Sequence, residues 1–354
     1  MPLSIRAYVH HPDIYTRRSG MYPLAEAMGA ETVFYTSRWE QAQHVSWRLG
    51  QVVRRFSQSW YGSEWSYLFP VWDEWRMARA GRAPVDVDHF LFGEFAYPRH
   101  PAWFRKKARL LAGTFHASSR RLPRVLGGYR GFRSFDVITL MSASQKPYFL
   151  EQGFPAESLF VTRHGVDTSY FRPDPERPAS GEGPLRGLLV GSTERDHAFM
   201  AAVLRALPPG VLQMTILTSA DQRSLHYQDV PYADFPRHLP DAGLLAAYQK
   251  ADLLIMPMLD CTANNAILEA MACGTPVMTN PVGGIREYVD PGCNFILPDQ
   301  DVDAWVDQLL ALARERDALR ARRPSVRAWA ETFDWNLRAR EFVDVFEQAL
   351  AVRS

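Results

Sequence analysis

Residues 266–277 read AILEAMACGTPV, and the pair Gly283-Gly284 follows them closely. The string predicts a short apolar helix that carries one carboxylate, Glu269, near its start. Gly274 is expected to end the helix in a left-handed conformation, since Pro276 cannot continue it, and a strand should begin at Val277. At the positive end of the helix dipole, Glu269 should stay ionised and suit a vicinal diol such as a ribose. The competing interpretation is an ordinary helix-to-strand connection of an α/β protein. The neighbouring segments distinguish the two interpretations.

Two further segments give that context. Tyr248–Pro257 reads YQKADLLIMP, and Arg163–Pro173 reads RHGVDTSYFRP. The three segments resemble, in kind and order, the motifs of glycosyltransferase family 4, whose members have the GT-B fold. In that family a YxxADxxxxP segment precedes the donor-site helix, and a PNGVD…F.P segment leaves the first domain. The resemblance covers the C-terminal half and is weak in the N-terminal half.

The resemblance implies an α/β protein of GT-B type, with two Rossmann-like, doubly wound domains facing across a cleft. It also implies a retaining glycosyltransferase, which moves a sugar from a nucleotide diphosphate sugar to a glycan, lipid-linked or small-molecule acceptor. No cofactor is expected, and no metal at the catalytic centre. Two alternatives are a nucleotide-sugar-binding protein or partner subunit with little turnover, and a sugar-nucleotide epimerase of the same fold.

The pattern along the chain predicts the domain organisation. A length of 354 residues suits two domains. Strands and helices alternate, which predicts parallel sheets. The N-terminal, acceptor-side domain should span residues 1–165, and the C-terminal, donor-binding domain residues 166–336. An amphipathic helix over residues 337–354 should return to the first domain, as in GT-B enzymes. Short apolar runs predict the strands, at Ile5–Val9, Glu31–Thr36, Asp88–Phe92, Leu110–Phe115, Val137–Leu140, Phe160–Thr162, Gly187–Gly191, Met214–Thr218, Leu253–Pro257 and Pro276–Thr279.

The resemblance makes Glu269 the second Glu of the family's E-x7-E motif, which holds the donor ribose. The position of the first Glu is occupied by Cys261, a departure from the family, with Asp260 beside it. Asn264 and Asn265 precede the helix, where backbone N–H groups bind anions and side-chain amides can bond sugar hydroxyls or a diphosphate. The competing interpretation is that one of these residues only caps the helix.

A second group of candidates follows the predicted strand Gly187–Gly191. Gly191 and Ser192 should contact the donor, and Arg195 is the candidate phosphate clamp because its planar guanidinium gives bidentate, permanently charged contacts. The family places its Arg where this chain has Ser192. A surface Arg paired with Asp196 is the alternative interpretation.

The N-terminal half offers three candidates. His116 ends the strand Leu110–Phe115, where many family members have a His that bonds the donor sugar or the acceptor. His164, in the hinge motif, is a secondary candidate. Gly20, in the loop after the first strand, should line the cleft at the carboxyl end of the sheet or form a plain turn.

The charge distribution bears on partners. Residues 1–160 carry 21 Lys+Arg and 13 Asp+Glu, whereas the remainder carries 19 and 26. Seven of the ten tryptophans lie between Trp39 and Trp103. The basic, Trp-rich segment predicts peripheral membrane contact, a grip on a lipid-linked acceptor, or stacking on sugars, with ordinary domain packing and solvated charge as the alternative. A nucleic-acid partner is not expected.

The sequence also bears on location. No apolar run reaches about eighteen residues, and no export signal is evident, which predicts a cytoplasmic protein, with peripheral contact at the inner membrane face as an option. Cys261, Cys273 and Cys293 lack paired or metal-ligand spacing, which predicts reduced thiols and no metal.

Overall fold

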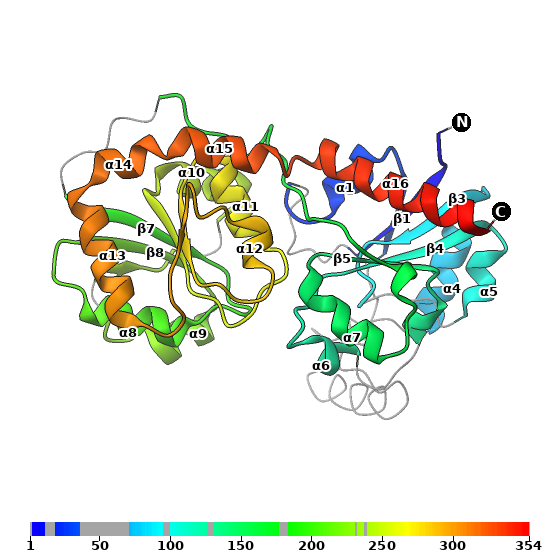
Figure 1. Ribbon diagram of the computed structural model, residues 1–354, viewed down its shortest axis with the longest axis horizontal. Helices are drawn as coiled ribbons and strands as arrows, with labels where there is room; N and C mark the ends of the chain where they lie inside the picture. The colour runs from blue at the N-terminus through cyan, green and yellow to red at the C-terminus, as the bar shows by residue number, and fades with distance from the viewer. Residues whose placement is uncertain are drawn as a thin grey trace. The chain divides into compact units, whose positions relative to one another are not determined.

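The computed structural model describes residues 2–10, 18–35, 71–81, 83–94, 100–126, 131–176, 183–230, 232–236 and 239–353. The chain divides into two compact units: residues 1–165 with 335–354, here the N-terminal domain, and residues 166–334, here the C-terminal domain. Within the described residues each domain holds a six-stranded parallel sheet, and Figure 1 shows helices on both faces of each sheet. The predicted parallel α/β architecture is confirmed.

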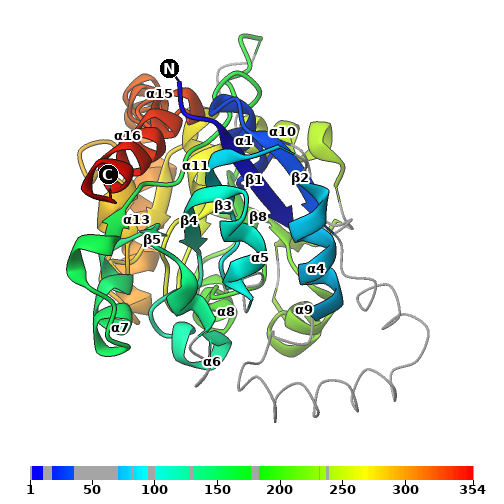
Figure 2. The same ribbon diagram turned by 90° about the vertical axis from the view of Figure 1, so that its right-hand side faces the viewer.

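The N-terminal sheet has the strand order β2-β1-β3-β4-β5-β6. Figure 2 shows α4 and α5 on one side of this sheet and α1 and α16 on the other. Its strands are β1 (Ile5–His10), β2 (Glu31–Tyr35), β3 (Val85–Phe90), β4 (Ala108–Phe115), β5 (Val137–Leu140) and β6 (Leu159–Val161). Its α-helices are α1 (Tyr22–Ala27), α4 (Val71–Ala80), α5 (Pro101–Arg105), α6 (Leu122–Leu126), α7 (Lys146–Glu151) and α16 (Trp335–Arg353).

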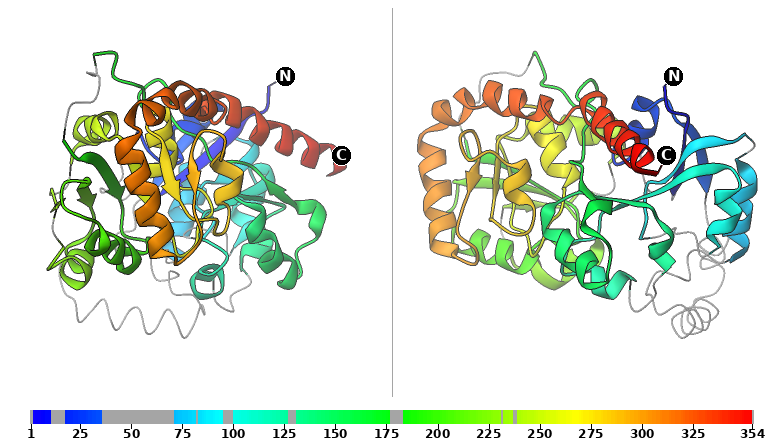
Figure 3. Two further views of the ribbon diagram at one scale, coloured as in Figure 1. Left: turned by 60° about the vertical axis from the view of Figure 1, so that its left-hand side comes forward. Right: turned by 45° about the vertical axis from the view of Figure 1, so that its right-hand side comes forward.

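The C-terminal sheet has the order β12-β11-β10-β7-β8-β9. The chain runs from β7 to β8 and β9 on one side of the sheet, and it then continues with β10 on the other side of β7. The strands β7 and β10 therefore flank the switch point where ligands bind in such sheets. Figure 3 shows this domain from two further sides. Its strands are β7 (Leu185–Val190), β8 (Leu212–Leu217), β9 (Ala233–Asp234), β10 (Leu253–Met256), β11 (Val277–Thr279) and β12 (Phe295–Ile296). Its helices are α8 (His197–Ala206), α9 (Ala220–His226), α10 (Asp241–Lys250), α11 (Asn265–Ala272), α12 (Ile285–Tyr288), α13 (Val302–Arg314), α14 (Arg316–Ala321) and α15 (Arg323–Glu331).

Two sequence expectations need correction. The strands β9 and β12 were not predicted, since each pairs over only two residues. The sequence pattern over Ala318–Phe333 predicts a single helix, and this prediction is wrong: α14 ends at Ala321, and α15 begins at Arg323 with Pro324 in its first turn. Proline lacks the N–H that a continuous helix needs at that point. The Trp/Arg-rich stretch Trp47, Arg48, Arg54, Arg55, Trp60, Tyr61 and Trp65 lies outside the described residues.

The C-terminal helix α16 packs on the N-terminal sheet. The rings of Phe342 and Phe346 lie 5.7 and 5.0 Å from the imidazole of His89 on β3. At the end of the helix, Arg353 pairs with Asp136 at 2.5 Å. Burial lowers the pKa of His89 to about 3, so this imidazole is neutral between the phenylalanines. No helix in the described part of the chain combines the length and apolar character needed to cross a membrane.

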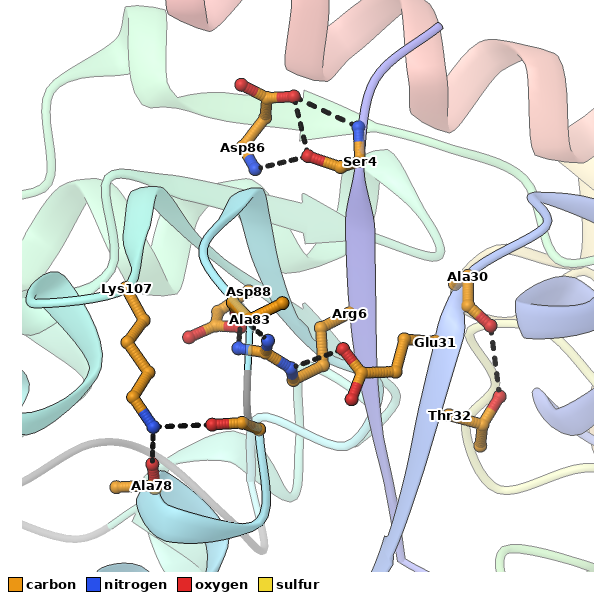
Figure 4. Close-up of polar contacts among 11 residues, drawn as sticks. Ser4, Arg6, Ala30, Glu31, Thr32, Ala78, Ala83, Asp86, Asp88 and Lys107 are labelled. Atoms are coloured by element: carbon orange, nitrogen blue, oxygen red, sulfur yellow. Dashed lines mark hydrogen bonds and ion pairs between the residues drawn. The ribbon is translucent and has the colours of Figure 1, made fainter.

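A buried arginine ties three strands of the N-terminal sheet together (Figure 4). The strand register sets Arg6 of β1 beside Glu31 of β2 and Asp88 of β3. Its guanidinium lies 3.0 Å from the Glu31 carboxylate and 3.1 Å from that of Asp88, and it also donates to the carbonyl of Ala83. The side chains of Arg6 and Asp88 are each 1% exposed. Burial raises the pKa of Asp88 to about 7, against the opposing effect of Arg6.

We predict that Asp88→Asn lowers the free energy of unfolding by about 3–5 kcal/mol, because it leaves a buried guanidinium without its buried counter-charge. Glu31→Gln should cost about 1 kcal/mol or less, since that carboxylate side chain is 46% exposed and screened by water. The double variant Arg6→Met/Asp88→Leu should regain most of the loss. Urea unfolding followed by circular dichroism measures all three, and an Asp88→Asn variant as stable as wild type would refute the interpretation.

Candidate functional site

The helix predicted from the motif is α11. Asn264 caps it, with its Oδ1 accepting from the N–H of Ile267 at 3.3 Å. At the other end Gly274 has φ +69°, and the N–H groups of Gly274 and Thr275 donate to the carbonyls of Met271 and Ala270. This bond pair is the Schellman motif. The predicted helix end at Gly274 and the strand start at Val277 are confirmed.

Glu269 is buried, with 4% of its surface exposed. It is the fifth residue of α11, so the expectation that the helix dipole holds it is wrong: the dipole effect fades beyond the first turn. Its Oε2 instead accepts from the phenol of Tyr248 at 2.8 Å. Burial and the Glu269 charge raise the pKa of Tyr248 well above its usual value, so the phenol remains a donor. Tyr248 was missed as a site residue, although it begins the YxxAD motif.

Arg195 lies in the turn that follows β7, at the switch point. Its guanidinium folds over that turn and donates to the carbonyls of Val190 at 3.0 Å and Thr193 at 2.6 Å. A longer bond of 3.4 Å reaches Oδ1 of Asn264, the cap of α11. Burial lowers the pKa of Arg195 below its usual value, yet a guanidinium remains charged in proteins. The Arg195–Asp196 surface pair is not what forms, because Asp196 caps α8 by accepting from the N–H of Phe199 at 2.9 Å.

The loop after β10 crosses the turn after β7. The N–H of Leu259 donates to the carbonyl of Glu194 at 3.0 Å, and that of Asp196 to Pro257 at 2.8 Å. Glu194 has φ +58°, a conformation that costs a non-glycine residue on the order of 1 kcal/mol or more. These contacts bring the loop that carries Asp260 and Cys261 against the Arg195 turn.

Cys261 is a buried thiol. Burial raises its pKa to about 12, with the Arg195 charge acting in the opposite direction. Its N–H donates to Oδ1 of Asp260 at 2.8 Å, and its carbonyl accepts from Gly284 at 2.7 Å. A Cβ on Gly283 would lie 2.1 Å from that carbonyl, so the Gly283-Gly284 pair permits the close approach. The residue at this position is Cys261 rather than a glutamate, and its buried thiol is neutral.

Ser192 takes part in a network between strand ends. Its hydroxyl lies 3.0 Å from that of Thr218 and accepts from the N–H of Ser219 at 2.9 Å. Thr218 in turn lies 3.2 Å from Nε2 of His197, whose Nδ1 is 2.9 Å from the hydroxyl of Tyr227. Burial lowers the pKa of His197 to about 4. His197 was missed in the sequence, since a single His after a predicted strand end carries no pattern.

Asn265 is the first residue of α11.

The N-terminal candidates lie at strand ends of their own domain. His116 follows β4, and its N–H donates to Oε1 of Glu94 at 2.7 Å. His164 is buried, with Nδ1 2.7 Å from the carbonyl of Gly165 and its ring 4.8 Å from Trp335. Burial lowers the pKa of His164 to about 3, which makes it a neutral packing partner rather than a charged ligand. Gly20 has φ +77° in the turn before α1.

The chain resembles a known family over part of its length. Residues 186–315 match the family model described as glycosyl transferases group 1. The matched region contains the Arg195 turn, the loop at Cys261 and helix α11.

Curated relatives match the chain over about half of its length. The D-inositol 3-phosphate glycosyltransferase of Paenarthrobacter aurescens is 28% identical over 222 residues, which cover 56% of this chain and 54% of that protein. The phosphatidyl-myo-inositol mannosyltransferase of Mycobacterium leprae is 31% identical over 172 residues, 45% and 46% of the two chains. The chain thus spans about half the length of these two relatives.

Solved structures show that the fold is GT-B, as predicted. Sucrose-phosphate synthase from Thermosynechococcus elongatus aligns with a TM-score of 0.69 at 16% identity, covering 99% of this chain and 100% of that one. Anabaena HepE in complex with UDP and glucose aligns with a TM-score of 0.63 at 12% identity, covering 98% and 100%. These structures confirm the predicted fold, and the family-model match of residues 186–315 and the curated relatives agree with the resemblance to glycosyltransferase family 4.

The Arg195 turn allows a test of its own packing. Gly191 has φ +101°, and a Cβ there would lie 2.7 Å from Nη2 of Arg195, whereas Gly210, at φ +81°, has open space around a Cβ. We predict that Gly210→Ala costs about 1 kcal/mol from the backbone strain alone. Gly191→Ala should cost about 1–3 kcal/mol more, because Arg195 must leave its carbonyls. Urea unfolding compares the two, and equal losses would show that Arg195 is not packed on this turn.

Proposed function

We propose that this protein is a retaining glycosyltransferase, which moves a sugar from a nucleotide diphosphate sugar to a glycan, lipid-linked or small-molecule acceptor. The observation that carries the proposal is the buried Glu269 carboxylate on α11, set with Arg195 and Asn264 at the switch point of the C-terminal sheet. Support comes from the names of the relatives, which include an inositol phosphate glycosyltransferase and a mannosyltransferase, and from the UDP and glucose bound to HepE.

In this proposal Glu269 anchors the donor ribose. One carboxylate oxygen accepts from Tyr248, which fixes the side-chain rotamer. The carboxylate retains acceptor capacity, since an ionised carboxylate has about four lone-pair sites. Two ribose hydroxyls can therefore bond to the same carboxylate. In this proposal Glu269 recognises the ribose diol and does not distinguish the nucleotide base.

Arg195 and Asn264 stabilise the leaving diphosphate in this proposal. The guanidinium has five N–H donors, so bonds to Val190, Thr193 and Asn264 leave donors for phosphate oxygens. Negative charge develops there as the glycosidic bond to phosphate breaks, and a fixed cation lowers that barrier. The acceptor hydroxyl attacks from the face that the diphosphate leaves, and a departing phosphate oxygen takes its proton, which retains the configuration without a protein base or a metal.

His116 serves in the proposal as a hydrogen-bonding group toward the donor sugar or the acceptor. It stands at the carboxyl end of β4, and its side chain is 21% exposed. Gly191, Ser192, Asp260 and Asn265 complete the proposed donor surroundings in the C-terminal domain, while Gly20 and His164 stay secondary candidates in the N-terminal domain. We also propose a cytoplasmic location, with the basic N-terminal half open to peripheral membrane contact and no nucleic-acid partner.

The direct test is binding followed by turnover. A thermal-shift panel of nucleotide diphosphates and nucleotide sugars should raise the melting temperature for one base, since a ligand at a hundred times its dissociation constant stabilises by about 2.7 kcal/mol. Incubation of that donor with acceptor extracts should release the nucleoside diphosphate and give a product with the donor's anomeric configuration. Binding without turnover would favour the nucleotide-sugar-binding or partner-subunit alternative, and a change in the donor sugar itself would favour the epimerase. An inverted product would refute the retaining mechanism.

Glu269→Gln should weaken nucleoside diphosphate binding about tenfold to a hundredfold, because charged acceptor bonds to the ribose become neutral ones. The matched control is Glu331→Gln in the same domain, whose carboxylate is 53% exposed and pairs with Arg327. That control should bind like wild type. Titration calorimetry measures both, and unchanged affinity in Glu269→Gln would remove the ribose role.

A further inference from the structure

Glu94 is a buried carboxylate that the sequence did not single out. It follows β3 and is 2% exposed, and its Oε1 accepts from the N–H groups of His116 and Ala117 at 2.7 and 2.9 Å. These two bonds fasten the segment after β3 to the end of β4. They occupy one carboxylate oxygen and hold the other in a fixed direction.

The second oxygen faces the imidazole of His116. Oε2 of Glu94 is buried, lies 3.5 Å from Nδ1 of His116 and accepts no hydrogen bond from the described residues. A buried carboxylate oxygen without a donor is costly, and the imidazole N–H is the donor at hand. The ring of Phe92 lies 4.8 Å from that of His116 and limits its rotation.

Two other histidines lie near His116 among the described residues, and neither is a carboxylate that could accept its proton. The ring of His164 is 6.3 Å away, and its Nδ1 must donate to the carbonyl of Gly165. Both His164 and His89 interact electrostatically with His116, yet burial keeps each of them neutral. Among the described residues, Glu94 is thus the carboxyl group that faces Nδ1, from the segment after β3.

We infer that Glu94 is a positioning residue that places the proton of neutral His116 on Nδ1 and leaves Nε2 as a hydrogen-bond acceptor. The inference deepens the proposed function and rests on it for its catalytic consequence. With Nε2 as an acceptor, His116 receives a hydrogen bond from a sugar or acceptor hydroxyl and so fixes the direction in which that hydroxyl points. The other tautomer would present a donor instead and reverse that hydrogen bond.

The chain contains a matched control for this pair. In the same domain, buried Glu74 accepts from the N–H of His100 at 2.6 Å and lies 3.1 Å from Nδ1 of the same residue. The geometry repeats that of Glu94 and His116, although the proposed function assigns Glu74 and His100 no part in transfer. A Gln at either position keeps a carbonyl for the backbone N–H and turns an amide N–H toward the imidazole.

The experiment compares Glu94→Gln with Glu74→Gln in the full chain. Nitrogen-15 spectra of labelled histidine report the tautomer, and transfer kinetics report kcat and KM. We expect wild-type His116 as the Nδ1–H form and Glu94→Gln as the Nε2–H form, with kcat lower by about tenfold or more and donor KM within about twofold. Glu74→Gln should leave the His116 tautomer and kcat as in wild type. In a His116→Gln background, Glu94→Gln should lower kcat no further.

An unchanged His116 tautomer in Glu94→Gln, or an equal loss of kcat in Glu74→Gln, would overturn the inference. If Glu94→Gln does not fold, the wild-type spectrum still tests the inference, because a wild-type His116 in the Nε2–H form would contradict it. Absence of transfer by the wild type would instead refute the proposed function, while the tautomer comparison would still show whether Glu94 positions His116.

Discussion

The C-terminal site depends on the crossing of two chain segments at the switch point. The turn after β7 and the loop after β10 exchange backbone hydrogen bonds between Glu194 and Leu259 and between Pro257 and Asp196. Parallel strands supply no such contact by themselves, because their ladder ends where the strands end. The crossing therefore sets the position of Arg195 relative to α11. The same hydrogen bonds hold Glu194 in its left-handed backbone conformation. Such strain persists in a folded protein because the surrounding contacts fix the backbone there.

Much of the architecture follows from local patterns. Buried strands of four to eight residues are apolar runs between turn residues, as Val137–Leu140 and Ala108–Phe115 show. The motif around Glu269 gave the helix end because Gly274 and Pro276 carry their own backbone constraints. The short strands β9 and β12 carry no such pattern, since their pairing comes from neighbours in the sheet rather than from their own residues.

The site could be predicted only in part for a related reason. A motif names residues along one segment, whereas their hydrogen-bond partners come from elsewhere in the fold. Tyr248 lies 21 positions from Glu269, and Glu94 lies 22 positions from His116. No helical or strand period relates such pairs. Arg6 is similar: an arginine inside a strand reads as an exposed residue until the register places Asp88 beside it.

The replacement of the family's first Glu by Cys261 changes the electrostatics of the switch point. A carboxylate at that position would be a buried anion near the Arg195 guanidinium, and the two charges would largely compensate each other. The thiol is neutral, because burial raises its pKa to about 12. The carboxylates that oppose the positive charge of Arg195 are then Glu269 and Glu194. In the proposed function, an incoming diphosphate competes with any anion that already faces the guanidinium, so a neutral neighbour favours the diphosphate. Under that proposal the thiol of Cys261 strengthens the binding of the leaving diphosphate by Arg195.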